Sequence, residues 1–457
     1  MNVLGNPSLV LEVTAFQRGC AGGAWTDGDA ALRLGHDWLL RQRIDALKFR
    51  SIDSLLRPTT PPPPPSSSTT HPSLLELLLA RGHTCSASAV DACAAAGALA
   101  LLQWLVAHTP TGPVRCSHHA LDDACANGHL DTVTWLVAQF EEACDGGRTT
   151  LAPLPDDVTH THRAVDLAAA HGHLTILHAL HRSSKLVSPA TTAAMDAAAK
   201  AGHVDVLDWL HLHRREGYTA TAIRAAASEG HLNVIQWLSA SSTVRRHLNA
   251  GWDARVMDSA AAAGHVDVVA WLHAHRREGC TPMAMSMAAA HGHVHVLEFL
   301  HRHRTERCTD DALDWAASAG QLAAVHWLHA HADELPLHVS VVAMDEAAGH
   351  NHHEIVRFLH THRTEGCTAS AMDSAAANGY LDMVRWLHAN RSEGCTEWAI
   401  CLAALSDKLD VAQFLHAERR ECQGREALES ARLYAGEGSR VRAWVDQMLL
   451  QPATALV

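Results

Sequence analysis

Hydrophobic and polar positions alternate along this chain in a pattern that repeats about every 28 residues, as from Gly264 to Gly292. Each copy is anchored on a glycine that is usually followed by histidine. After the anchor, hydrophobic residues recur at offsets that fall on one helix face, for example at Val266, Val269 and Leu272. Before it, a threonine precedes a run of small residues and stands where a helix N-cap belongs. Each repeat is therefore predicted to be a short alanine-faced helix, a turn and a longer second helix.

The anchors define about twelve repeats, and two of them depart from glycine. Asparagine and aspartate stand at Asn351 and Asp407, and these residue types best tolerate the left-handed conformation after glycine. The turn is therefore predicted to require a positive φ at this position. The anchors are Gly97, Gly128, Gly172, Gly202, Gly230, Gly264, Gly292, Gly320, Asn351, Gly379, Asp407 and Gly436.

An aromatic residue stands seven positions after most anchors, and a leucine follows it each time. We expect these aromatic side chains to fill the core between repeats, because neither helix can bury its hydrophobic face alone. The predicted fold class is all-α, an α-solenoid of stacked helix-turn-helix repeats. The aromatic positions are Trp104, Trp135, Trp209, Trp237, Trp271, Phe299, Trp327, Phe358, Trp386 and Phe414.

The repeats resemble ankyrin repeats. The segments AAKAGHVDVLDWL from Ala198 and AASEGHLNVIQWL from Ala226 are similar to the A-A-x-x-G-H-x-x-V-x-x-L-L core of that family, and the resemblance covers residues 74–445. It implies a scaffold that offers an extended surface to protein partners. Two features depart from the family: methionine and aspartate replace its T-P-L-H block, as at Met372-Asp373, and the repeat is shorter than the usual ~33 residues. The β-hairpin finger of ankyrin repeats is therefore expected to be reduced to a loop.

The array has a different kind of sequence in front of it. Residues 58–72, PTTPPPPPSSSTTHP, are predicted to be an extended linker. Residues 1–57 are predicted to form a helical segment, either a cap or a degenerate F-box. The repeats with a more polar C-terminal cap occupy 73–450, and 451–457 form a tail. The positions that loosely match an F-box are Pro7, Leu9, Leu11, Val13, Leu32 and Leu34.

The charge of the chain sets an expectation about its partners. The formal net charge is −13 with the 37 histidines neutral, and no long basic run occurs. Because nucleic-acid binding needs a basic surface to neutralise phosphates, no nucleic-acid partner is expected. No secretion signal and no membrane-length hydrophobic stretch is visible, and the twelve cysteines indicate reduced thiols. A monomer in the cytoplasm or the nucleus, without a membrane partner, is expected.

Three recurring polar features suggest chemistry, and each has a structural interpretation. In the H-x-H-R-x-E-G-C segment, His273 and His275 lie two positions apart on a helix and point in different directions, so no metal site is predicted. A cysteine ladder, for example Cys280 and Cys308, is predicted to be buried and free of disulfides, because stacked helices lie ~10 Å apart. The aspartate six residues before most anchors, such as Asp258, either accepts hydrogen bonds from the neighbouring loop or forms an acidic stripe.

No nucleophile paired with a base and no phosphate-binding glycine motif is present, so neither catalysis nor a cofactor is predicted. The predicted function is a protein-binding scaffold. A ubiquitin-ligase substrate adaptor and a histidine-rich metal- or pH-responsive protein remain alternatives. The binding surface is expected at the variable positions after the capping threonines: Pro282, Met283, Asp310, Asp311, Ala369, Ser370, Glu397 and Trp398.

Overall fold

A computed structural model describes residues 86–108, 114–144, 151–153, 162–183, 190–244, 251–338 and 340–450. The predictions for the N-terminal segment 1–57, the linker 58–72 and the tail 451–457 lie outside these residues. The described chain forms two compact units, divided after Tyr218. Within the described ranges, no helix is both long and apolar enough to cross a membrane.

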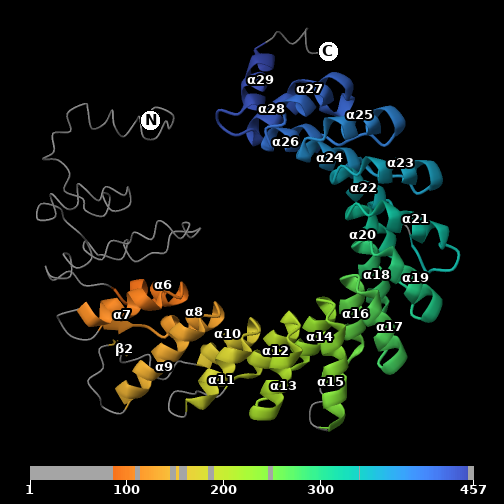
Figure 1. The fold of residues 1–457 in the computed structure, drawn as a ribbon. Helices are drawn as coiled ribbons and strands as arrows, with labels where there is room; N and C mark the ends of the chain where they lie inside the picture. Colours follow the sequence, from red (N-terminus) through yellow and green to blue (C-terminus); the bar gives the residue numbers. More distant parts are fainter. Residues whose placement is uncertain are drawn as a thin grey trace, which may run out of the picture. The chain divides into compact units, whose positions relative to one another are not determined.

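Unit 1 contains four helix pairs and a two-stranded sheet among its described residues (Figure 1). Strands β1 (Val114–Cys116) and β2 (Leu151–Pro153) pair in parallel, with Val114 opposite Leu151. They follow α7 and α9, in the connections that lead to α8 and α10. The helices are α6 (Ala87–Ala95), α7 (Leu99–His108), α8 (His119–Ala126), α9 (Leu130–Cys144), α10 (His162–Ala170), α11 (Leu174–Arg182), α12 (Thr192–Ala201) and α13 (Val204–His213).

Unit 2 contains eight further pairs in the part of the chain that the structure describes. The first helices of the pairs are α14 (Ala220–Ser228), α16 (Ala254–Ala262), α18 (Pro282–Ala290), α20 (Ala312–Ser318), α22 (Val342–Gly349), α24 (Ala369–Asn378), α26 (Trp398–Leu405) and α28 (Arg425–Tyr434). The second helices are α15 (Leu232–Val244), α17 (Val266–His275), α19 (Val294–His303), α21 (Leu322–Ala330), α23 (His353–His362), α25 (Leu381–Asn390), α27 (Leu409–Glu418) and α29 (Arg440–Leu449), and a 3-10 turn, η3 (Arg420–Cys422), precedes α28.

The helices of unit 2 form two rows, one of first helices and one of second helices (Figure 1). Neighbouring first helices touch along their length, whereas neighbouring second helices touch less extensively. The cause is side-chain size: the first helices meet through alanines such as Ala260, Ala288 and Ala316, all fully buried, and alanine lets two backbones approach closely. Within this unit the first helices therefore line the inner side of the curve. The all-α solenoid predicted from the sequence is confirmed.

The turn between the two helices of a repeat is built on a left-handed anchor residue. Asn351 and Asp407 have φ of 65° and 51°, like the anchor glycines, so the prediction made at these two positions is confirmed. The predicted position of the last anchor is wrong, because φ is positive at Gly438 and not at Gly436. The terminal pair α28 and α29 connects through a longer turn, and its surface carries an Arg432–Asp446 ion pair of 2.5 Å, in line with a polar cap.

The core of the array does not lie where the aromatic residues suggested. Of the aromatic positions, only Trp209 is buried, at 5% exposure, whereas Trp271 and the others are half-buried. The leucine that follows each aromatic residue is the core residue: Leu238, Leu300 and Leu328 are all at most 1% exposed. The aromatic residue precedes this leucine by one position and so points about 100° away from it around the helix. Its ring contacts the neighbouring second helix instead, as Phe299 does at His273.

The recurring aspartate joins each repeat to the next. In unit 2, Asp258 accepts hydrogen bonds from the backbone N–H of Thr281 at 2.8 Å and from its hydroxyl at 2.7 Å. Asp345 and Asp373 bind Thr368 and Thr396 in the same way. The threonine hydroxyl in turn caps the following helix, accepting from the N–H of Met283 in the case of Thr281. The interpretation of these aspartates as acceptors for the neighbouring loop is confirmed, and they form no free acidic stripe.

Histidines that follow the anchor, such as His265 and His352, make a second link between repeats. Nε2 of His265 lies 3.1 Å from the carbonyl oxygen of Ser228, in the preceding repeat, and His352 binds Ser318 likewise. The imidazole lies directly on the anchor glycine of that preceding repeat: a Cβ placed on Gly230 would come within 2.5 Å of the His265 ring. The anchor is therefore glycine for two reasons, its positive φ and the ring that covers it.

The ladder cysteines are buried and free, as predicted, but the spacing argument fails at one pair. Burial raises the pKa of Cys280, Cys308 and Cys367 to about 11. At Cys395 and Cys422 the two sulfur atoms lie only 3.7 Å apart. Cys395 lies in the loop before α26 and Cys422 lies in η3, so a spacing between helix axes does not describe the distance between their side chains.

We therefore predict that the diazene oxidant diamide joins Cys395 to Cys422 and leaves Cys280, Cys308 and Cys367 unlinked. A hydrogen bond from Cys422 lowers the pKa of Cys395, which favours the thiolate that starts the exchange. Peptide mapping without reduction should find this disulfide, with Cys395→Ser as the control that removes it. A link between Cys280 and Cys308 in the untreated protein would contradict the stacking described here.

Candidate partner-binding surface

The residues proposed from the sequence for partner binding all lie at the start of first helices in unit 2. Pro282 and Met283 begin α18, Asp310 and Asp311 precede α20, Ala369 and Ser370 begin α24, and Glu397 and Trp398 lie at the start of α26. Consecutive first helices are in contact, so these positions follow one another along a single edge of unit 2. The structure thus brings the predicted residues into one row. We call this row the capping edge.

On the capping edge, backbone N–H groups form the helix caps, whereas the side chains after the threonine take no part in capping. The N–H groups of Met283, Ser370 and Trp398 each donate to the capping threonine of their own helix, at 3.1 to 3.2 Å. Pro282 occupies the first helical turn, where its lack of an N–H costs nothing. Because capping fixes the backbone and the threonine alone supplies the acceptor, the side chains at the next two positions are free to vary.

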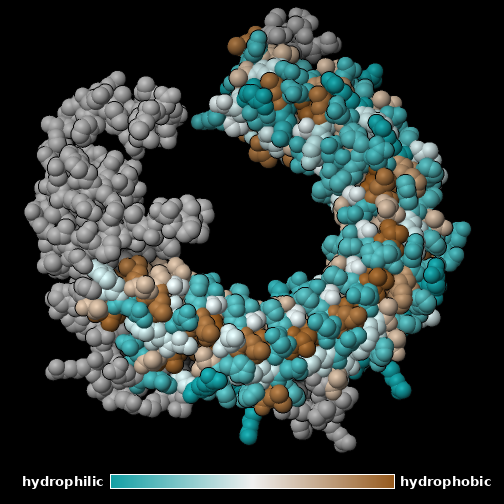
Figure 2. All heavy atoms as spheres, viewed as in Figure 1, coloured by the Kyte–Doolittle hydropathy of each residue, from teal (hydrophilic) through white to brown (hydrophobic). Residues whose placement is uncertain are grey.

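Large hydrophobic side chains are exposed on this edge. Met283 is 38% exposed and Trp398 is 49% exposed. The Trp398 ring contacts Tyr434, itself 42% exposed, with ring centres 5.7 Å apart in an edge-on arrangement. An aromatic pair that is half in water and outside the repeat core is a typical anchor for a protein partner. Figure 2 shows hydrophobic side chains recurring between hydrophilic ones along unit 2 on the face that it presents.

The polar members of the edge differ from one another. Asp311 accepts a hydrogen bond from the hydroxyl of Thr309 at 2.5 Å, so one of its oxygen atoms is engaged. The side chains of Asp310, Ser370 and Glu397 are exposed, and Ala369 is half-buried. The edge therefore offers a carboxylate or hydroxyl in some repeats and a hydrophobic group in others.

Two members of the surface were missed by the sequence analysis. Val342, 45% exposed, begins α22 at the position equivalent to Met283. It was overlooked because its repeat is capped by Ser340 instead of threonine; Ser340 donates to Asp314 at 2.7 Å and accepts from the Val342 N–H. The spacing of five residues from Ser340 to Asp345 could have found it. Tyr434 had no such signal, because it ends the atypical last repeat.

The second helices and the loops that follow them are occupied by internal contacts. His273 meets the Phe299 ring of the next repeat edge-on, whereas His275 stacks on Trp271 of its own helix at 4.6 Å. The two histidines therefore serve different rings, as expected from their spacing. In the loops of unit 2, arginine and glutamate pair within each R-x-E segment, for example Arg304 with Glu306 at 2.5 Å. These pairs leave the loops few free charges.

Comparison with known proteins identifies the repeats. The family model described as ankyrin repeats (many copies) matches residues 195–238, 257–301 and 344–388. Each match spans two consecutive helix pairs, each with its left-handed anchor, as from α16 to α19 in the second match. This chain therefore contains ankyrin repeats within residues 195–388. The family is one of repeat-based binding scaffolds, and no catalytic family is indicated. No curated protein sequence matches the chain.

Solved structures of other helical repeat proteins are similar in architecture only. The pentatricopeptide repeat protein PPR10 from maize is 14% identical, with a TM-score of 0.33, over 99% of this ankyrin-repeat chain and 65% of that chain. PPR10 in complex with an 18-nt psaJ RNA element is 11% identical, with a TM-score of 0.26, over 96% of this chain and 77% of that one. This chain thus spans less than two thirds of the length of the first of these proteins.

The expectation that nucleic acid is excluded as a partner is wrong. It rested on the acidic net charge and the absence of a basic run, and it treated both as properties of the whole surface. The similar structures include a helical repeat protein in complex with RNA. Net charge does not describe the local charge of one edge of a long array, and it therefore excludes no class of partner here.

Proposed function

We propose that this ankyrin-repeat chain is a non-catalytic scaffold that binds a protein partner through the capping edge of unit 2. The observation that supports the proposal most is the exposed aromatic pair Trp398 and Tyr434, next to a row in which Met283 and Val342 are also exposed. None of these four side chains is needed for repeat stacking, which the buried alanines and leucines provide. We further propose a location in the cytoplasm or the nucleus.

The composition of the edge also favours a protein partner. Interface anchors are rich in aromatic residues and methionine, surrounded by polar groups. Trp398 lies beside Glu397, and Met283 lies in the repeat before Asp310 and Asp311. The outer faces of the second helices lack this combination, because their aromatic rings are covered by histidines, as Trp271 is by His275.

The test has two stages. A photo-crosslinking amino acid at position 283 or 342 should capture the partner in cells, and the same residue at position 302, on the outer side of α19, should not. With the captured protein purified, Trp398→Ala should weaken binding roughly 30-fold, the effect of removing a ~2 kcal/mol hot spot. Asp311→Ala should weaken it less, because a side chain at the rim stays partly hydrated.

Arg302→Ala is the matched control, since Arg302 is exposed on α19. Circular dichroism and melting temperature should show that all three variants are folded. If only Arg302→Ala weakens binding, the partner lies on the second helices and the capping edge has been assigned in error.

The alternative of a ubiquitin-ligase adaptor gains no support, because the F-box-like residues lie outside the described part of the chain. The histidine-rich alternative in its original form also gains none, since the histidines of the H-x-H segments stack on aromatic rings. A different group of histidines, in unit 1, leads to a separate inference.

A further inference from the structure

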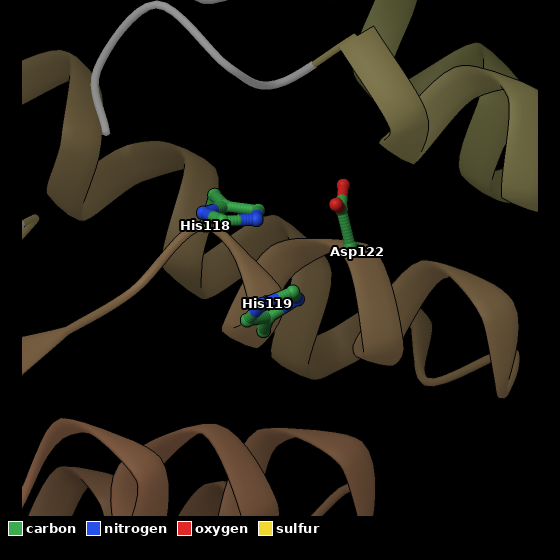
Figure 3. A group of neighbouring side chains, drawn as sticks. All are labelled: His118, His119 and Asp122. Atoms are coloured by element: carbon green, nitrogen blue, oxygen red, sulfur yellow. The ribbon is translucent and has the colours of Figure 1, made fainter. Parts of the chain in front are cut away.

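Two neighbouring histidines stand at the start of α8 in unit 1. Ser117 takes the place of the capping threonine, and His118 and His119 follow it at the two variable positions. Asp122 comes five residues after Ser117, where the other repeats have the aspartate that joins them to the next repeat. Figure 3 shows the His118 ring and the Asp122 carboxylate on the same side of the helix, with His119 beside them.

Asp122 differs from the equivalent aspartates in its hydrogen bonds. Asp91 accepts from the N–H and the hydroxyl of Ser117, at 2.9 and 2.6 Å, and Asp166 accepts from Thr191 in the same manner. Among the described residues neither carboxylate oxygen of Asp122 has a hydrogen-bond partner, although the residue is only 1% exposed. A buried carboxylate without a donor is costly. It is the kind of group that a bound cation would stabilise.

The charge around Asp122 is consistent with such a role. Burial raises the pKa of Asp122 to about 6, while the nearby His118 and Arg163 oppose the shift. Arg163 does not reach the carboxylate to form an ion pair, because both oxygen atoms remain unpartnered.

The spacing along the helix places three ligand atoms together. Residues three and four positions apart are neighbours on a helix surface, so Asp122 is adjacent to both His119 and His118. One ligand atom from each of the three residues lies within 4.8 Å of the others, and the two imidazole rings are 4.0 Å apart. Tetrahedral zinc, with bonds of ~2.1 Å, needs ligand atoms about 3.4 Å apart, a distance that small side-chain rotations reach.

We propose that His118, His119 and Asp122 form a binding site for a divalent transition-metal ion of the zinc class. Two imidazole nitrogens and one carboxylate favour zinc over magnesium or calcium, which prefer oxygen ligands alone. Three protein ligands leave a fourth position for water. The site belongs to unit 1 and does not depend on the proposed partner surface of unit 2.

The experiment compares metal binding by the full chain and by matched variants. The purified, chelator-treated protein is titrated with Co²⁺, whose visible absorption bands report tetrahedral nitrogen and oxygen ligation, and then with Zn²⁺ in competition. The wild-type chain should bind one ion that Asp122→Asn, His118→Gln and His119→Gln each bind at least tenfold more weakly. The double variant His291→Gln/His350→Gln removes two exposed histidines elsewhere and should match the wild type. It controls for weak binding by the many other histidines.

A melting experiment gives an independent readout. Zinc should raise the melting temperature of the wild type and of the control, and it should not raise that of Asp122→Asn. Without metal, Asp122→Asn should be at least as stable as the wild type, because it removes an unpaired buried charge. His119 is exposed, so His119→Gln keeps the test valid if a change at Asp122 impairs folding. Equal cobalt spectra and equal zinc stabilisation in all variants, or a thiolate charge-transfer band, would overturn the proposal.

Discussion

Leu272→Ala should destabilise the repeats around α17 by about 2 to 5 kcal/mol, because it leaves a cavity at a site that is 2% exposed. Trp271→Ala, one position earlier, should cost less, about 1 to 2 kcal/mol, since its ring is half-buried and mainly covers His275. The two substitutions form a matched pair on one helix. The smaller residue, leucine, is expected to give the larger loss of unfolding free energy, which is the reverse of what residue size alone would suggest.

The measurement is hydrogen exchange with mass spectrometry, read repeat by repeat. Stacked repeats contact only their neighbours, so Leu272→Ala should raise exchange first in the helix pairs next to α17. A uniform rise over the whole of unit 2 would contradict the nearest-neighbour description. A larger loss for Trp271→Ala than for Leu272→Ala would contradict the assignment of leucine as the core position.

Gly320→Ala should destabilise unit 2 by about 2 to 4 kcal/mol, for two separable reasons. The anchor has φ of 77°, which alanine adopts at a cost of about 1 to 2 kcal/mol. The new Cβ would also lie 2.5 Å from the His352 ring and displace it from the carbonyl oxygen of Ser318. Denaturant unfolding of the variant gives the total loss.

A double-mutant cycle with His352→Ala separates the two causes. In the His352→Ala background, the destabilisation by Gly320→Ala should lose the contribution from the clash with the ring and keep the contribution from the left-handed backbone. Gly436→Ala is the control: it has no positive φ and nothing within 4 Å of an added Cβ, so the change should be within ~0.5 kcal/mol. Equal losses for Gly320→Ala with and without His352 would show that the ring is not the obstacle.

Most of the fold could be predicted because the same local requirement recurs in every repeat. Asn351 and Asp407 were informative since a non-glycine residue is tolerated at the anchor only if it accepts a left-handed backbone. The role of Asp258 as a hydrogen-bond acceptor could be predicted, because carboxylates that recur in successive repeats would repel one another unless each accepts hydrogen bonds from the adjacent loop. The prediction failed at Gly436 because the turn between α28 and α29 is longer than the other turns, and the glycine with positive φ is Gly438.

The features that could not be predicted depend on distances between repeats. The half-exposure of Trp271 follows from how far apart the second helices stand, which no pattern along one helix reveals. The contact between Cys395 and Cys422 depends on the approach of two loops. At the candidate partner-binding surface, variation after the threonines marked the right positions, but it gave no sign of Val342 or of the Trp398–Tyr434 contact. The lack of a hydrogen-bond donor at Asp122 could not be predicted either, because most repeats carry the same aspartate in the sequence.

The link between Asp258 and Thr281 recurs with the same chemistry between Asp345 and Thr368, and the link between His265 and Ser228 recurs between His352 and Ser318. A deletion of the 28 residues 264–291 would place Thr309 where Thr281 had been, and the Asp258 carboxylate would meet an identical hydroxyl. Whole repeats can therefore be gained or lost by recombination in phase without any compensating change at the new junction. In such a gene, array length can change faster than the stacking interface itself, and the capping-edge side chains of each added copy are then free to diverge.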